Sequence, residues 1–255
     1  MRQKLWQNKI LIVRWCFVLI LFWMCYDMVF NSVNWRFADR SSAGIAPKPA
    51  EFSDAVVQVY AARTYNWRGY FAVHSWIAVK PKNAQTYTTY QVVGFYLWRN
   101  RSAVDIQQGI PDKHWYGNKP ELLADLRGKT AEDAIPLIDK AAKSYPYPFL
   151  YHAYPGPNSN TFISYIIRQV PQLKMALPNI AIGKDFLGYT TFFAPSESKT
   201  GWQFSFYGIL GITIGFVEGL EVNLLGLNFG VDFLQPALKI PFWGRIGMSR
   251  VFFEN

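Results

Sequence analysis

Apolar and polar residues alternate along the chain directly after residue 53. Residues 54–63, 69–81 and 86–98 show this alternation and are rich in Val, Thr and Tyr, which favours β-strands. The turn-like sequence PKNAQ at 81–85 separates the second run from the third. These two runs are therefore predicted to form a hairpin.

Helical spacing of apolar residues replaces the alternation further along the chain. Residues 119–128 and 130–146 each begin and end with residues typical of helix termini, although Pro136 is expected to kink or shorten the second helix. A third helix is predicted within residues 158–171. Its apolar positions recur at intervals of four residues, at Phe162, Ile166 and Val170.

The last third of the chain is rich in glycine and aromatic residues. Residues 201–216 and 219–233 alternate in places and are predicted to be strands with bends at glycine. A second membrane span is the alternative, but the apolar run is short and interrupted by glycine; an apolar patch at a membrane interface also stays open. The order of strands, helices and strands predicts an α+β domain of antiparallel strands packed on helices.

A long apolar run, residues 9–30, lies near the start of the chain. It is long enough to cross a hydrocarbon core of about 30 Å as a helix. Basic residues precede it, which favours a cytoplasmic N-terminus. The run is therefore predicted to be an uncleaved transmembrane anchor in a bacterial inner membrane, with a cleaved signal peptide as the alternative.

This anchor defines the predicted organisation of the chain. Residues 1–8 would be a cytoplasmic tail, and residues 31–53, rich in small residues and proline, would be a linker. Residues 54–255 would then form a periplasmic domain of the bacterial envelope. The lipid bilayer, contacted through residues 9–30, is the first expected partner.

Composition limits the function classes. The chain is 51% hydrophobic and 18% aromatic, which is enough for a sizeable core. Its formal net charge is +9, but the basic residues are scattered, so no nucleic-acid partner is expected. Both cysteines, Cys16 and Cys25, lie in the N-terminal apolar run, which excludes a catalytic thiol or a cysteine-based zinc site in the rest of the chain.

His74 is the first candidate for chemistry. It lies in the middle of a predicted strand, on the face shared with Ala72, Trp76 and Ala78. The opposite face carries four apolar residues, Phe71, Val73, Ile77 and Val79. The simplest interpretation is a hydrogen-bonded structural histidine. The functional alternative is a general base, because imidazole titrates near neutral pH.

Ser159 is the second candidate, in the polar cluster NSNT at 158–161 that opens the third predicted helix. The simplest interpretation is that this cluster caps the helix. The functional alternative is a nucleophile at a helix N-terminus, where free N–H groups stabilise an oxyanion. A serine hydroxyl needs a base within hydrogen-bond reach, and Asn158 or Asn160 would donate to the same oxyanion.

Other polar residues offer weaker signals. His114 and His152 are not spaced as a known metal motif, so no metal or other cofactor is predicted. Lys184 and Asp185 lack the glycine frame of a nucleotide site. Glu218 and Glu221 resemble a glycosidase pair only in being two carboxylates, and Arg245 between two glycines is an anion contact or a plain turn.

Several stretches of the chain together resemble a known family. These are VVQVYAARTYNWRGYFAVHSWIAVK (56–80), YPGPNSNTF (154–162), ALPNIAIGKDF (176–186) and GLEVNLLGLNFGVD (219–232). They are similar to an uncharacterised bacterial family, domain of unknown function 3750, over nearly all of residues 54–250. The resemblance implies a family and no activity.

A more distant similarity concerns the permuted NlpC-like, or papain-like, hydrolases. FAVHSWIAV resembles their histidine strand, and PNSNTFISYI resembles the helix that carries their nucleophile. The resemblance implies that His74 is the base, Ser159 occupies the cysteine position, and Gln91 on the next strand orients the imidazole. The chain departs from that family in having serine, whose hydroxyl does not ionise as a thiol does.

Two functional hypotheses follow. The first is a hydrolase or acyl transferase acting on an amide or ester of wall peptide or lipid. Its site would comprise Ser159, His74 and Gln91, with Asn160 and the first-turn amides as the oxyanion site. The second is a non-catalytic envelope protein of the same fold that binds lipid, wall material or a membrane partner.

Overall fold

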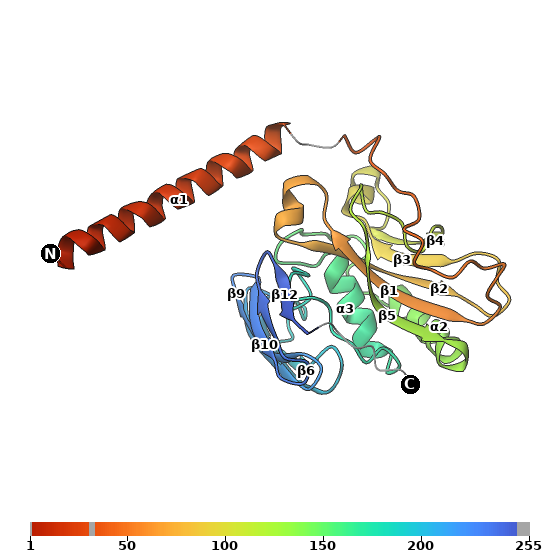
Figure 1. The fold of residues 1–255 in the computed structure, drawn as a ribbon. Coiled ribbons are helices and arrows are strands. Elements are labelled where there is room, and N and C mark those ends of the chain that lie inside the picture. Colours follow the sequence, from red (N-terminus) through yellow and green to blue (C-terminus); the bar gives the residue numbers. More distant parts are fainter. Residues whose placement is uncertain (1, 31–33, 249–255) are drawn as a thin grey trace.

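The structure is a computed structural model that describes residues 2–30 and 34–248. Two antiparallel sheets account for most of its regular structure, and α3 (Ser159–Gln169) lies between them (Figure 1). The predicted α+β class is therefore wrong: the chain is mostly β-sheet, with few helices in its described part. The C-terminal third explains much of the difference, because it pairs into seven strands.

The first sheet has five strands in the order β4-β3-β2-β1-β5. Every neighbouring pair is antiparallel, and His74 of β2 lies opposite Ala62 of β1. The strands of this sheet are β1 (Val56–Arg63), β2 (Val73–Lys80), β3 (Thr88–Val92), β4 (Val104–Gln108) and β5 (Glu121–Arg127). Two short 3₁₀ helices, η1 (Asn66–Tyr70) and η2 (Gly94–Arg99), follow β1 and β3.

One face of the first sheet is covered by α2 (Gly128–Lys143) and α3, and the main apolar core lies beneath them. Ile77 of β2, Ile138 of α2 and Phe162 of α3 are completely buried there. The opposite face carries a smaller cluster around Tyr60 and Trp76. Successive side chains of β2 therefore point alternately to the main core and to the smaller cluster. His74 lies on the same face as Trp76, as its position in the sequence predicts.

Residues 119–128 differ from the prediction, because most of this segment is the edge strand β5 and not a helix. Leu122, Leu123 and Leu126 have a spacing that suits either structure. Pairing with β1 decides between them, since tertiary contacts override weak local propensity. Pro136, by contrast, lies inside the continuous 16-residue helix α2, which is not shortened there.

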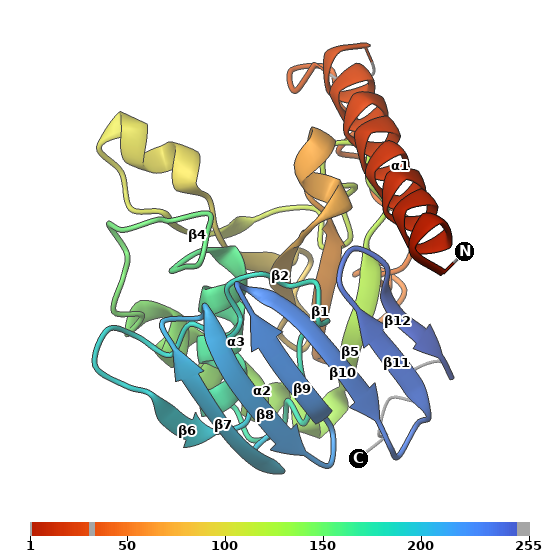
Figure 2. The same ribbon diagram turned by 90° about the vertical axis from the view of Figure 1, so that its left-hand side faces the viewer.

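The second sheet has seven strands in sequence order, so each strand pairs with the next along the chain (Figure 2). Its strands are β6 (Phe193–Pro195), β7 (Gly201–Phe206), β8 (Leu210–Gly215), β9 (Gly219–Leu224), β10 (Leu227–Asp232), β11 (Ala237–Ile240) and β12 (Gly244–Gly247). Residues 201–216 and 219–233, predicted to be bent strands, thus form two hairpins within this sheet.

The N-terminal apolar run lies in one long helix, α1 (Arg2–Phe30), which extends away from the sheets (Figure 1). Across residues 2–30 and 34–248, no helix combines the length and the apolarity that crossing a membrane requires. Arg14 and Asp27 interrupt the apolar run, and charged side chains are costly in hydrocarbon. The predicted transmembrane anchor at 9–30, and the single-pass inner-membrane location derived from it, are therefore wrong.

The predicted linker, residues 31–53, is irregular where the structure describes it, and residues 31–33 lie outside the described part. The segment contacts the loop between β4 and β5. Ser42 donates a hydrogen bond to Asp112 of this loop at 2.7 Å, and the backbone N–H of Ile45 donates to the same carboxyl group. Residues 249–255 of the predicted 54–255 domain are likewise outside the described part. The predicted domain boundaries stay predictions.

Candidate functional site

In the polar cluster at 158–161, Asn158 and Thr161 cap the helix α3, whereas Ser159 does not. Asn158 is the N-cap of α3, and its side-chain oxygen accepts hydrogen bonds from the backbone N–H groups of Asn160 and Thr161 at 2.9 and 3.2 Å. The Thr161 hydroxyl completes a capping box by accepting from the Asn158 backbone N–H. The cap is therefore Asn158, and Ser159 is released from that role.

Ser159 is the first residue of α3 and is 5% exposed. Within the described part of the chain, neither its hydroxyl nor its backbone N–H makes a hydrogen bond. The N-terminus of a helix carries a partial positive charge and free N–H groups, which favour a negative charge nearby. Ser159 thus offers a free hydroxyl and a free amide at the same point.

Asn160 attaches the start of α3 to β2 and to the loop after the helix. Its side-chain nitrogen donates to the carbonyl oxygens of Val73 and Ile182 at 2.9 and 2.8 Å. Its oxygen accepts from the Ser75 hydroxyl at 2.8 Å. These bonds use both ends of the amide, so Asn160 here positions the helix, and its predicted oxyanion role stays a prediction.

His74 is held by a chain of side-chain hydrogen bonds. Its Nε2 lies 3.2 Å from the Oε1 of Gln91, and the Nε2 of Gln91 donates to Asp105 at 2.8 Å. Because the amide nitrogen faces the carboxyl group, the amide oxygen faces the imidazole and needs a proton on Nε2. The neutral ring then has its lone pair on Nδ1. The structure thus brings His74 and Gln91 together, with Asp105 behind them.

Burial keeps this imidazole neutral. Loss of solvation is the main cause that lowers the pKa of His74 to about 3, although the hydrogen bond to Gln91 acts in the opposite direction. The positive charge of Lys113 lowers the pKa further. The ring also stacks on Trp115, with centroids 3.6 Å apart and planes 10° apart, so its orientation is fixed from two sides.

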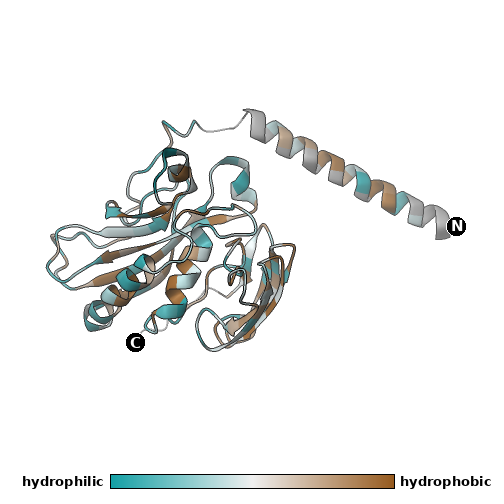
Figure 3. Ribbon diagram, turned by 180° about the vertical axis from the view of Figure 1, so that it is seen from behind, coloured by the Kyte–Doolittle hydropathy of each residue, from teal (hydrophilic) through white to brown (hydrophobic). Residues whose placement is uncertain are grey.

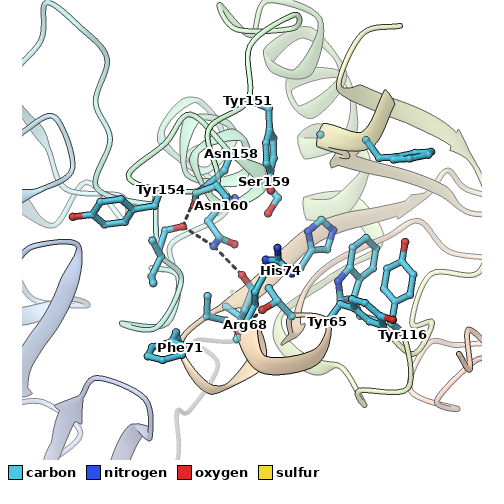
Figure 4. A pocket seen from close by; sticks show the side chains of 18 of the residues that line it. Tyr65, Arg68, Phe71, His74, Tyr116, Tyr151, Tyr154, Asn158, Ser159 and Asn160 are labelled. Atoms are coloured by element: carbon cyan, nitrogen blue, oxygen red, sulfur yellow. Dashed lines mark hydrogen bonds between the residues drawn. The ribbon is translucent and has the colours of Figure 1, made fainter. Parts of the chain in front are cut away.

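Ser159 and His74 reach into the same cavity, which has a volume of about 830 Å³ (Figure 4). In the described part of the chain no hydrogen bond joins the two side chains. Aromatic residues dominate the cavity wall, and Arg68 is the one residue with a permanent charge among the described residues that line it. The aromatic lining residues are Trp35, Tyr65, Trp67, Phe71, Phe95, Trp98, Trp115, Tyr116, Tyr151 and Tyr154.

The remaining candidates lie elsewhere. His114 is 3.5 Å from the carboxylate of Asp39, and the backbone N–H of His152 donates to Pro157. Within residues 2–30 and 34–248, no group of three or more His, Cys, Asp or Glu residues is arranged to hold a metal ion.

The two carboxylates of the glycosidase-like pair have different buried partners. Glu218 accepts hydrogen bonds from Ser198 and Thr200, whereas Glu221 pairs with Lys184 and Lys239 at 2.6 and 2.5 Å. Lys184 also lies 3.2 Å from Asp185, so these residues form a buried ionic cluster. Arg245 pairs with Asp232 at 2.6 Å, which makes it a contact between strands of the second sheet.

Sequence reasoning missed three residues of the site. Asp105 lies on β4 opposite Gln91, and only strand register places it there. Trp115 and Arg68 come from a loop and from η1, so no periodic pattern connects them with His74. The sequence offered one signal for Asp105: it is a polar residue that becomes buried if its segment pairs as a strand with the strand of Gln91.

Comparison with known proteins identifies a family for the chain and no activity. Residues 54–186 match the family described as Protein of unknown function (DUF3750), a region that includes Gln91, Asp105 and the whole cluster at 158–161. No curated protein and no solved structure matches. The papain-like similarity is not confirmed, and nothing in these comparisons indicates hydrolase activity. Because the match covers more than half of its residues, the chain belongs to the DUF3750 family.

Proposed function

We propose that the cavity is the site of a serine-dependent acyl-transfer reaction, hydrolysis of an ester or amide, with Ser159 as nucleophile and His74 as base. One observation carries the proposal: the hydrogen-bond chain Asp105–Gln91–His74 ends at a cavity into which an unbonded serine hydroxyl also reaches. A nucleophile, a base and a group that orients the base are the parts that such chemistry requires.

The reaction would proceed through an acyl-enzyme. The Ser159 oxygen attacks the carbonyl carbon while Nδ1 of His74 takes the hydroxyl proton, and the Ser159 backbone N–H donates to the oxyanion. His74 then gives this proton to the leaving amine or alcohol as the acyl bond breaks. Water, deprotonated by His74, releases the acyl group and regenerates the serine. The missing Ser159–His74 hydrogen bond would form with substrate bound, as is common for catalytic pairs.

The walls of the cavity favour an apolar acyl group. Aromatic side chains bury apolar surface effectively, and the cavity is large enough for an acyl chain or a hydrophobic peptide segment. The resemblance to permuted NlpC-like hydrolases supports the same roles for Ser159, His74 and Gln91, and the serine in place of cysteine makes the reaction depend on His74 more strongly.

A fluorophosphonate probe, which reacts with activated serines, tests the proposal directly. We expect the protein to be labelled at Ser159, with labelling lost in Ser159→Ala and reduced at least about tenfold in His74→Ala, since general-base catalysis contributes about 10²–10⁴-fold. Ser144→Ala is the matched control, because Ser144 lies at the C-terminus of a different helix, α2, and its hydroxyl donates a hydrogen bond to the carbonyl oxygen of Ala141. Labelling that is equal in Ser159→Ala and the unmodified protein would refute the assignment.

A second function, ligand binding without turnover, is favoured by the low basicity of His74. A base works best with a pKa near the working pH, and burial holds the pKa of His74 at about 3. In this case the probe leaves the protein unlabelled, while a fluorescent fatty acid still binds in the cavity. Replacing Tyr151 by Ala would then weaken binding of the fatty acid, whereas Ser159→Ala would not.

A further inference from the structure

The second sheet has an inverted distribution of polar and apolar side chains. Its inner face, toward α3, carries buried polar residues, including Gln203, Asn223, Asn228 and Lys239. Its outer face carries only apolar side chains along β6–β12, because the strands alternate strictly between the two faces. Hydrophobic and hydrophilic residues are interleaved along the ribbon of this sheet (Figure 3). In a water-exposed antiparallel sheet the usual arrangement is the reverse, with the apolar face inside.

The apolar residues of the outer face are large and exposed. Ile214 is 60% exposed and Trp202 is 54% exposed, and their neighbours across the strands are similar. The members with at least a third of their surface exposed are Phe193, Trp202, Phe204, Phe206, Leu210, Ile212, Ile214, Leu224, Phe229, Val231, Leu238 and Ile246. Monomeric soluble proteins rarely expose a continuous apolar surface of this kind, so something covers this outer face.

The inner face shows why the sheet cannot be turned around. Asp185, in the loop after α3, accepts hydrogen bonds from Gln203, Asn223 and Asn228 at 2.6, 3.0 and 2.6 Å. The ion pairs of Glu221 with Lys184 and Lys239 lie in the same layer. The polar side is therefore committed to the body of the protein, and the apolar side is left outward.

We propose that the outer face of β6–β12 docks on a lipid surface, and this proposal does not depend on the proposed reaction. A protein partner requires hydrogen-bonding groups, about one bond per 100–200 Å² of interface, and the outer face presents no polar side chain along its strands. The hydrocarbon of a lipid layer requires no hydrogen-bonding groups on the surface that contacts it. Strands that face lipid on one side show this same pattern of apolar side chains outward and polar side chains inward.

The charges around the sheet fit an anionic lipid surface. Within residues 187–248 the carboxylates of Glu197, Glu218, Glu221 and Asp232 are all buried, whereas Lys199 is exposed. No carboxylate in that described region would therefore repel anionic head groups. Trp202 and Trp243 are also exposed, and tryptophan favours the boundary between head groups and acyl chains.

Two residues that line the cavity contact turns of the second sheet. Phe71, which lines the cavity, packs edge-to-face on Phe242 between β11 and β12, with ring centroids 5.2 Å apart. Tyr154, another lining residue, lies against Gly226 between β9 and β10. A lipid surface under the sheet would thus lie near this part of the cavity wall.

A position-specific probe tests the proposal, because α1 also exposes apolar side chains and simple vesicle binding would not separate the two surfaces. In full-length protein with Cys16→Ser and Cys25→Ser, a single cysteine at Ile214→Cys carries an environment-sensitive nitrobenzoxadiazole dye. Phe149→Cys is the matched control, since Phe149 is 71% exposed and lies outside the second sheet. Vesicles of phosphatidylcholine and phosphatidylglycerol carry a nitroxide on the acyl chains.

We expect the dye at position 214 to shift to the blue and to be quenched by the nitroxide, and the dye at position 149 to do neither. Adding Ile212→Lys should reduce the quenching at position 214 severalfold. No change at position 214, or equal quenching at both positions, would overturn the proposal. So would a dye at position 214 that is already shielded without vesicles in a protein that sediments as a dimer, because a second copy would then cover the face.

Discussion

At the scale of single residues, the site depends on which atom of each polar side chain is already used. Asn158 caps α3, Asn160 ties the helix to β2, and Gln91 holds one imidazole nitrogen. Within residues 2–30 and 34–248, the Ser159 hydroxyl and the second ring nitrogen of His74 then have no hydrogen-bond partner. A sequence shows which groups are present, but it does not show which of them the fold leaves without partners.

The buried, neutral His74 predicts an acid-sensitive stability. Its folded pKa of about 3 is below its unfolded value of 6.5, so the unfolded state binds more protons between these values. The contribution of His74 is complete above pH 6.5 and is lost as the pH falls toward 3, at up to about 1.4 kcal/mol per pH unit. His74→Phe should flatten this part of the profile of unfolding free energy, measured by urea denaturation. A variant with the same slope as the unmodified protein would show that other groups cause it.

At the scale of elements, pairing with neighbouring strands decided whether a segment with an ambiguous sequence pattern formed a helix or a strand. The segment predicted as a helix at 119–128 became β5 because β1 has an open edge for it. The helix α2, in contrast, continues through Pro136, with apolar packing on β1 and α3 beneath it. The seven strands of the second sheet are held to the body by buried polar contacts and not by an apolar core.

These contacts make the second sheet sensitive to loss of one charge. Burial alone raises the pKa of Glu221, but Lys184 and Lys239 lower it to about 2, so its carboxylate is ionised near neutral pH. Glu221→Gln leaves two buried lysines without their shared partner, and we expect it to reduce the free energy of unfolding by about 3–5 kcal/mol. The control Glu51→Gln breaks the exposed pair with Lys48 and should cost less than about 1 kcal/mol. Equal effects in chemical denaturation would contradict this assignment.

At the scale of the whole molecule, α3 connects the two sheets. Its N-terminus faces the cavity beside β2, and near its C-terminus Arg168 donates hydrogen bonds to the carbonyl oxygen of Pro195 and to Gln203 in the second sheet. The same helix therefore positions the candidate nucleophile and anchors the sheet whose outer face we propose to contact lipid.

Removing the hydrogen bonds of Arg168 to the second sheet should make the chain segment between α3 and β7 more accessible to protease. Arg168→Met keeps the aliphatic part of the side chain and removes both hydrogen bonds, so we expect faster cleavage by chymotrypsin near Tyr189–Phe193, where several aromatic residues precede β7. Mass spectrometry of the fragments locates the cut. Arg127→Met, which removes a contact to Asp125 on the same strand, is the control and should be cleaved at the rate of the unmodified protein. Identical cleavage of both variants would argue against this role of Arg168.

The sequence by itself determined the strands around His74, the buried helix behind Ser159 and the family, because period and composition are local properties. The structure brings Gln91 to His74 and places Ser159 and His74 in the wall of one cavity, and the predicted roles of these residues stay predictions. Only the tertiary structure decided that 119–127 is a strand, that Asp105 stands behind Gln91 and that the second sheet turns its apolar face outward. These outcomes depend on strand register and on partners distant in sequence, which a pattern read along one chain does not contain.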